Sequence, residues 1–232
     1  MSTLALGMID RLADDLDGLR HVSELATPIG ARVRLFSSGR PGVRSGPEAF
    51  DEPVDELLEV EAGRLRDCLR ALADGGLHGG AMLEAEPYSI ANTVARQARL
   101  FEFAGADDIG YNWDFVNCWM GGEHPWPEPW RHLAGRLRGI HYKGARAVAG
   151  EPWRYASQAL PGDDDLSHRA IWATLAASGF DGPITVDPHY GHFAPRDRLV
   201  PVPANPEAEI CRRTLQTMRA LRAEALAAHG ES

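Results

Sequence analysis

Short apolar runs alternate with amphipathic stretches along most of this chain. The apolar runs predict five buried strands and a weaker one at the start of the sequence. The weak strand covers residues 3–6, and the others cover residues 32–37, 80–86, 109–114, 139–143 and 183–187. Their length and flanking glycines and prolines are typical of strands buried inside a sheet.

Between these runs, apolar residues recur every three or four positions, which is the spacing of one face of an α-helix. This pattern predicts helices over residues 12–22, 58–72, 93–103, 130–137 and 206–228. It predicts a further helix around Ile171 and Leu175, which Asp165 or Ser167 can cap and Gly179 stops. Asn92 or Thr93 can cap the third helix, and Gly105 ends it. Strands that alternate with helices at this spacing predict a parallel sheet of the α/β class.

Four predicted strands carry a side chain that can bind a metal ion at or near their carboxyl ends. These side chains belong to Glu84, Asp114, His141 and Asp187. In a parallel α/β barrel the carboxyl ends of the strands share one mouth, so we expect these side chains to meet there. Three carboxylates and an imidazole suit a hard divalent cation, and without one the buried carboxylates would repel each other. Each residue alone is also typical of a turn, a cap or a hydrogen-bonded barrel histidine.

Other polar residues lie close to the same strand ends. Glu86 points the same way as Glu84 because their spacing is two, and we prefer Glu84 as the ligand and Glu86 as a substrate contact. Arg34 and Lys143 follow strand ends and can hold a substrate hydroxyl or phosphate. Solvated loop charges or ion-pair partners are the alternative interpretation of both. His189 follows the last strand and is within reach of the site.

The order of these motifs resembles the xylose-isomerase-like barrel superfamily over roughly residues 10–195. The segments that carry the resemblance are Leu83-Glu84-Ala85-Glu86-Pro87, Asn112-Trp-Asp114-Phe-Val-Asn117, His141-Tyr-Lys143-Gly144 and Gly179-Phe-Asp-Gly-Pro-Ile-Thr-Val-Asp187-Pro-His189. The chain departs from the family pattern at Asp187, where a glutamate is usual, and at Gly144, where an acid is usual.

The resemblance implies one (β/α)8 TIM barrel domain over residues 1–232, N-terminally incomplete with about six of eight strands. It further implies a Mn²⁺, Mg²⁺ or Co²⁺ ion held by the four strand-end residues, with Glu84 and Asp187 also moving protons during sugar isomerisation or epimerisation. The implied substrate, a small sugar or polyhydroxy ketone, would contact residues of the mouth. These are Arg34, Glu86, Asn117, Lys143 and His189.

Three other functions fit parts of the pattern. An inosose-dehydratase-type lyase would use the same ligands, and a catalytically inactive sugar-binding barrel would keep the fold alone. An abasic-site endonuclease is disfavoured by the net charge of −9, which also argues against any nucleic-acid partner. No apolar run approaches the ~20 residues of a membrane span. With no signal peptide and no closely paired cysteines, we expect a cytoplasmic protein.

The expected absence of two βα units has three explanations. The favoured one is a start codon placed too late, with coding sequence upstream of Met1. The others are a fragment, and a homo-oligomer in which another subunit closes the barrel.

Overall fold

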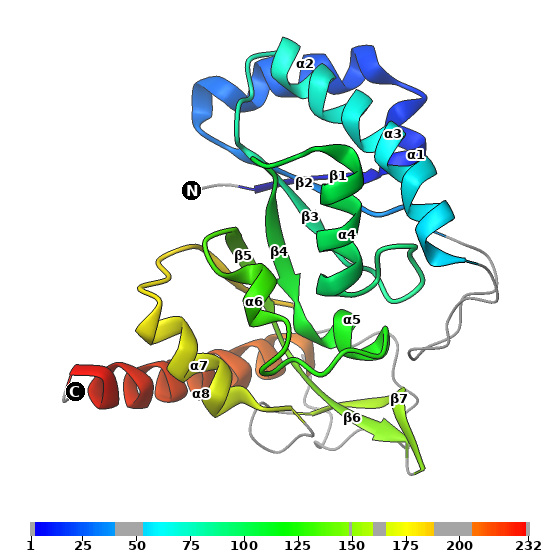
Figure 1. Cartoon of the computed structure of the whole chain (residues 1–232). Coiled ribbons are helices and arrows are strands. Elements are labelled where there is room, and N and C mark those ends of the chain that lie inside the picture. Colours follow the sequence, from blue (N-terminus) through cyan, green and yellow to red (C-terminus); the bar gives the residue numbers. More distant parts are fainter. Residues whose placement is uncertain (1–2, 40–52, 149, 160–165, 188–205, 231–232) are drawn as a thin grey trace.

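Six parallel strands form one sheet in this computed structural model, which describes residues 3–39, 53–148, 150–159, 166–187 and 206–230 (Figure 1). The strands follow the order β1-β2-β3-β4-β5-β8. Their bounds are β1 (Thr3–Met8), β2 (Arg32–Phe36), β3 (Ala81–Glu84), β4 (Gly110–Asp114), β5 (Leu137–Tyr142) and β8 (Ile184–Val186). All six predicted strands are confirmed, and so is the α/β class.

Helices lie between the strands of the sheet and one follows the last strand, as the amphipathic stretches predicted. They are α1 (Ile9–Ala13), α2 (Leu16–Ala26), the 3₁₀ turn η1 (Thr27–Ile29), α3 (Val54–Asp74), α4 (Val94–Ala104), α5 (Phe115–Met120), α6 (Trp130–Leu133), α7 (His168–Ala177) and α8 (Pro206–Gly230). The single helix predicted over 12–22 is two helices, because Asp15 leaves the helical conformation and its side chain accepts a hydrogen bond from Gly18 N. The helix predicted over 130–137 is also shorter, since Leu137 already belongs to β5.

Local capping explains where the best-predicted helix begins and ends. The Thr93 side chain accepts a hydrogen bond from Arg96 N, which satisfies one free amide at the start of α4. Gly105 then adopts a left-handed conformation with φ of 59° at the end of this helix. The sequence had left Asn92 and Thr93 as alternatives, and the structure selects Thr93.

Alternation along the strands separates a helix-facing side from an inner side. On β2, Val33 and Leu35 are fully buried and belong to the hydrophobic core, together with Leu65 and Leu72 of α3. Arg34 and Phe36 alternate with them and therefore point to the other face of the sheet. This inner face carries the polar residues described below.

A two-stranded antiparallel hairpin follows β5 and has no counterpart in the sequence-based prediction. It consists of β6 (Gly144–Val148) and β7 (Glu151–Ala159), and only Lys143 separates β6 from β5. The chain therefore leaves the parallel sheet within one residue of the strand end, and it returns to the sheet only at β8.

The sheet is open in the part of the chain that the structure describes. β1 and β8 are its outer strands, and no described strand pairs with the outer side of either. The architecture is therefore a six-stranded section of a (β/α)8 barrel, as the fold prediction states. Among the described helices, none is long and apolar enough to cross a lipid bilayer.

Candidate metal centre

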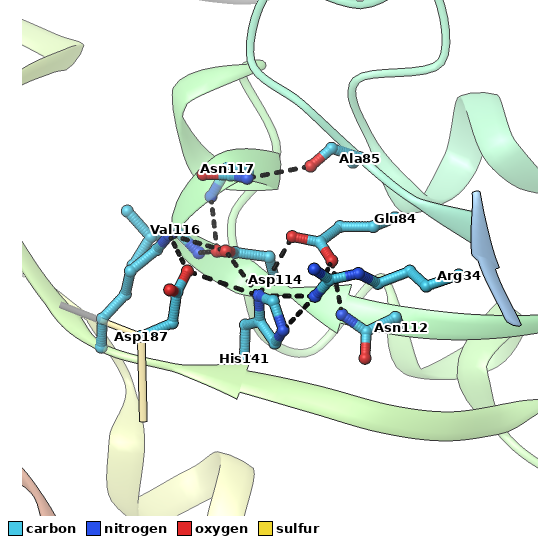
Figure 2. A network of polar contacts seen from close by, with 10 residues as sticks. Arg34, Glu84, Ala85, Asn112, Asp114, Val116, Asn117, His141 and Asp187 are labelled. Carbon is cyan, nitrogen blue, oxygen red and sulfur yellow. Dashed lines mark hydrogen bonds and ion pairs between the residues drawn. The ribbon is translucent and has the colours of Figure 1, made fainter. Parts of the chain in front are cut away.

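The carboxyl ends of four neighbouring strands bring the predicted ligands together (Figure 2). Glu84 and Asp114 are the last residues of β3 and β4, and Asp187 follows β8 directly. In the parallel register Asp114 lies beside His141 of β5. Glu84 pairs with Asn112, two residues before Asp114, and His141 pairs with Thr185, two residues before Asp187. The four side chains therefore lie at the carboxyl end of the sheet, with a stagger of two residues at two of the three steps.

Three carboxylate oxygens converge on one nitrogen of the histidine. His141 Nδ1 lies 3.1 Å from Glu84 Oε1, 3.4 Å from Asp187 Oδ2 and 3.8 Å from Asp114 Oδ2. The ligand atoms of Glu84, Asp114 and His141 all lie within 4.8 Å of one another, and these three residues are buried. Asp187 is more open, with 32% of its side chain exposed.

Two of the carboxylates are held by their second oxygen. Glu84 Oε2 accepts a hydrogen bond from Asn112 Nδ2 at 2.6 Å and pairs with Arg34 Nη1 at 2.8 Å. Asp114 Oδ1 accepts from the backbone amides of Val116 and Asn117 at 3.1 and 3.0 Å, where it caps α5. The other oxygen of each carboxylate is therefore left facing the histidine.

Two basic side chains neutralise part of this charge. Lys143 Nζ lies 2.7 Å from Asp114 Oδ2 and 3.3 Å from Asp187 Oδ2. Arg34 Nη1 contacts His141 Nε2 in addition to Glu84. Lys143 is the only lysine among the 24 Lys and Arg residues of the chain. Its ammonium is compact and carries three donors, so it can pair with both carboxylates at once.

The acidic surroundings change the proton affinity of both basic groups. Burial alone would lower the pKa of His141, but the carboxylates of Asp187 and Glu84 outweigh it and raise this pKa to about 9. Burial also opposes the charge on Lys143, yet Asp114 and Asp187 raise its pKa above the ordinary value. Both shifts have one cause, which is a negative potential that attracts cations.

The donor set fits a divalent cation. Carboxylate oxygens and an imidazole nitrogen are ligands of Mn²⁺, Mg²⁺ and similar ions. Glu84, Asp114 and His141 each offer a ligand atom within 4.8 Å of the other two, and Asp187 Oδ2 lies beside this group, 3.4 Å from His141 Nδ1. Hydrogen bonds orient Glu84 and Asp114. Ligands fixed in this way by neighbouring groups are typical of metal centres in proteins.

The remaining predicted site residues lie at different places. Lys143 is almost fully buried and paired with Asp114 and Asp187, so it is an ion-pair partner and not a solvated loop charge. The Asn117 side chain donates to the carbonyl of Ala85 at 3.0 Å and lies behind the carboxylates. Glu86 lies in the loop after β3 and lines a cavity of about 590 Å³ along β1, together with Phe36. His189 lies outside the described residues.

One residue of the cluster was missed by the sequence-based prediction. Asn112 lies on the same face of β4 as Asp114 and donates to Glu84. Its amide needs the space beside Gly139 of β5, where a Cβ atom would lie 2.5 Å from Asn112 Oδ1. The sequence carried a signal for this residue, because Asn112 stands two positions before the predicted ligand Asp114 and so lies on the same face of the strand.

Comparison with known proteins agrees with this architecture. The family model described as xylose isomerase-like TIM barrel matches residues 8–221. No curated protein sequence matches the chain. Among solved structures, an L-ribulose 3-epimerase has a TM-score of 0.64 at 15% identity, over 93% of this chain and 69% of that one.

Two further solved structures contain metal. The IOLI protein with a binding zinc atom has a TM-score of 0.69 at 14% identity, over 97% of this chain and 77% of that one. A xylose isomerase-like TIM barrel protein from Mycobacterium smegmatis, in complex with magnesium, has a TM-score of 0.65 at 16% identity, over 97% and 74% of the two chains. At these identities the similarity establishes the fold.

Proposed function

We propose a function from the premise that this chain belongs to the xylose isomerase-like TIM barrel family. The protein is a divalent-metal-dependent enzyme that isomerises or epimerises a small sugar, sugar phosphate or other polyhydroxy ketone. The observation that carries this proposal is the convergence of Glu84, Asp114 and Asp187 on Nδ1 of His141, at 3.1 to 3.8 Å. Such a set is costly to bury unless a cation compensates it.

Glu84, Asp114, His141 and Asp187 would hold the ion, and Mn²⁺, Mg²⁺ or Co²⁺ suits these ligands. When bound, a divalent ion supplies a Lewis acid that polarises the substrate carbonyl and stabilises negative charge on its oxygens. The chain itself orients these ligands, since Asn112 and Arg34 fix Glu84 while the start of α5 fixes Asp114.

Proton transfer is assigned to two carboxylates. Glu84 takes the proton from the carbon beside the carbonyl, which leaves an enediolate. In epimerisation a proton returns to the same carbon from the opposite face. In isomerisation a proton returns to the former carbonyl carbon, and the hydroxyl proton moves to the former carbonyl oxygen. Asp187 is the second proton carrier, because its side chain is the most open of the ligands, with 32% exposure. Its carboxylate is one methylene shorter than the family's usual glutamate, so the substrate must approach it more closely.

The residues around the ion would bind the rest of the substrate. Arg34 and Lys143 reach the ligands directly and can contact substrate oxygens. Glu86 contributes to the wall of the cavity along β1. His189 and Asn117 are the remaining residues proposed to bind substrate. Asn117 would act indirectly, because its side chain donates to the carbonyl of Ala85, next to Glu84.

A water-eliminating lyase is the second candidate, and one observation favours it. The Lys143 ammonium, held protonated by its raised pKa, lies 3.3 Å from Asp187 Oδ2. It can donate a proton to a leaving hydroxyl group after Glu84 has taken the carbon-bound proton. Product mass separates the two reactions, because an isomer keeps the mass of the substrate and a lyase product loses one water.

Metal binding is the first test, with a matched pair of variants. Titration of Mn²⁺ into the metal-free protein by calorimetry should show one site, and Glu84→Gln should weaken it by about tenfold or more, the effect expected when a ligand loses its charge. Glu86→Gln removes the same charge two residues away and should bind Mn²⁺ like the natural protein. If the natural protein binds no divalent ion, the proposed function is wrong.

Hydrogen exchange is the second test. The Mn²⁺-loaded protein should exchange the carbon-bound hydrogen beside the carbonyl of its ketose substrate for deuterium in D₂O, as seen by proton NMR. A panel of small ketoses and their phosphates is suitable, and Asp114→Ala should abolish the exchange. Metal binding without exchange for any member of the panel would favour an inactive sugar-binding barrel.

A further inference from the structure

One buried carboxylate of α3 has no part in the metal centre. The other buried side chains of this helix are leucine, alanine and cysteine, whereas Glu61 is a carboxylate with no exposed surface. Burial raises the pKa of Glu61, although hydrogen bonds from Ser38 act in the opposite direction. An apolar side chain would fill this position at a lower cost, so packing alone does not explain the carboxylate.

Glu61 holds the segment that follows β2. Its Oε1 atom accepts a hydrogen bond from the backbone amide of Ser38 at 2.7 Å, and its Oε2 atom accepts from Ser38 Oγ at 2.7 Å. The Ser37 hydroxyl lies 3.5 Å from Glu61 Oε1. Ser38 Oγ in turn accepts from the backbone amide of Asp10, in the first turn of α1, at 3.0 Å. The carboxylate therefore fixes both the backbone and the side chain of Ser38.

The same two serines hold the loop of residues 85–91, which follows β3 and is called the β3 loop below. The carbonyl of Ser38 accepts a hydrogen bond from the amide of Ile90 at 3.1 Å, and Ser37 Oγ accepts from the amide of Ala91 at 3.0 Å. The end of the β3 loop is therefore connected to the carboxylate on α3 through the segment after β2.

The β3 loop begins directly after the metal ligand Glu84 and carries Glu86, the proposed substrate contact. Glu86 and Tyr88 line the cavity along β1. Within the loop, Ser89 Oγ donates to the carbonyl of Glu86 at 2.8 Å, and Ser89 forms an isolated β-bridge with Gly39. The position of Glu86 therefore depends on the segment after β2, which the carboxylate on α3 holds in place.

We propose that Glu61 is a positioning residue, which holds the β3 loop through the two serines and so places Glu86 for substrate binding. This inference rests on the proposed function, in which Glu86 contacts the substrate. Glu61 acts through other residues and is therefore not itself catalytic. The metal ligand Glu84 is held separately by Asn112 and Arg34, so a change at Glu61 should leave the metal centre intact.

Amide hydrogen exchange of the full chain, followed by NMR at one pH, tests the hold on the loop. Glu61→Met keeps the length of the side chain and removes both acceptors. In this variant the amides of Ile90 and Ala91 should exchange about 10- to 100-fold faster, the range for a lost hydrogen bond to a charged group. These amides bind the serines and not Glu61, so faster exchange reports movement of the serines. Glu61→Gln should restore most of the protection, because its carbonyl can accept from Ser38 N and its amide can donate to Ser38 Oγ.

Glu123→Met is the matched control. The carboxylate of Glu123 also accepts from two backbone amides, those of Val94 and Ala95 at the start of α4, at 2.8 and 3.0 Å. This variant should speed exchange at Val94 and Ala95 far more than at Ile90 and Ala91, and Glu61→Met should show the opposite pattern.

The effect on substrate is measured with the ketose of the panel whose carbon-bound hydrogen the Mn²⁺-loaded natural protein exchanges fastest. In Glu61→Met the KM should rise by about tenfold, while kcat and Mn²⁺ affinity stay unchanged, and Glu61→Gln should restore the KM. If Glu61→Met does not fold, Ser37→Ala takes its place, since it keeps Glu61 and removes the acceptor of the Ala91 amide. It should speed amide exchange at Ile90 and Ala91 and raise the same KM.

Unchanged amide exchange at Ile90 and Ala91 refutes the inference, and so does an equal loss of protection throughout α3 and α4. Faster amide exchange with an unchanged KM refutes the placement of Glu86 and leaves the proposed function intact. A fall in kcat or in Mn²⁺ affinity as large as the change in KM also refutes it, since Glu61 would then act on the metal centre. A natural protein that exchanges no ketose refutes the proposed function and with it the placement of Glu86, while the amide rates still decide whether Glu61 holds the loop.

Discussion

Replacing Lys143 by methionine should separate the stability of the metal-free protein from its affinity for metal. Methionine keeps the unbranched shape of the side chain and removes its charge. The Lys143 ammonium lies 2.7 Å from Asp114 Oδ2 and 3.3 Å from Asp187 Oδ2. Breaking a buried ion pair costs about 3–5 kcal/mol because the partner charge stays buried. Since Asp187 is 32% exposed, we expect the lower end, about 3 kcal/mol.

In thermal unfolding with EDTA this loss should lower Tm by about 6–12 °C, at about 2–4 °C per kcal/mol for a chain of this size. Saturating Mn²⁺ should raise the Tm of the variant more than it raises the Tm of the natural protein. Lys143 competes for the oxygens of Asp114 and Asp187 that face His141, so Lys143→Met should bind Mn²⁺ more tightly and gain more in Tm. Arg32→Met is the control, because it also replaces a charged side chain by methionine but removes a hydrogen bond to the carbonyl of Arg138 and no contact with these oxygens. An equal or smaller gain than in the natural protein would show that Lys143 and the ion do not share these oxygens.

Two further predictions concern the same centre. Asn112→Ala removes the 2.6 Å hydrogen bond to Glu84 and should weaken Mn²⁺ binding by about tenfold or more, as measured by calorimetry. Gly139→Ala should also weaken Mn²⁺ binding, because the added Cβ atom would displace the Asn112 side chain. Unchanged Mn²⁺ binding in both variants would contradict the role of Asn112 in positioning Glu84. The pKa of His141, raised from 6.5 to about 9, means that its protonated form stabilises the metal-free fold fully below pH 6.5 and that this contribution is lost as pH rises through about 9. In EDTA the Tm difference between the natural protein and His141→Gln should therefore shrink over this range, and a difference independent of pH would count against the shift.

Much of the scaffold and most of the centre are predictable from local sequence. The strands were recognisable because β2, β3 and β4 are short apolar runs bounded by turn residues, and α4 carries both of its capping signals. The four predicted ligands were identified because each stands at or beside a strand end, and the structure brings their side chains together. The hairpin β6–β7 was missed, since it follows β5 without the loop that usually separates two strands. A cytoplasmic location and the lack of a nucleic-acid partner stay predictions.

The sequence by itself determined which residues meet, because parallel strands bring their carboxyl ends to one edge and alternation fixes the face of each side chain. Only the tertiary structure decided how each atom is used. It assigned one oxygen of Glu84 to Asn112 and Arg34 and left the other for His141. It also paired Lys143 with two acids, where the sequence had left a solvated loop charge or an ion-pair partner as the alternative to a substrate contact. The reason is that a hydrogen bond depends on distances of a few tenths of an ångström between distant segments, and residue order alone does not set these distances.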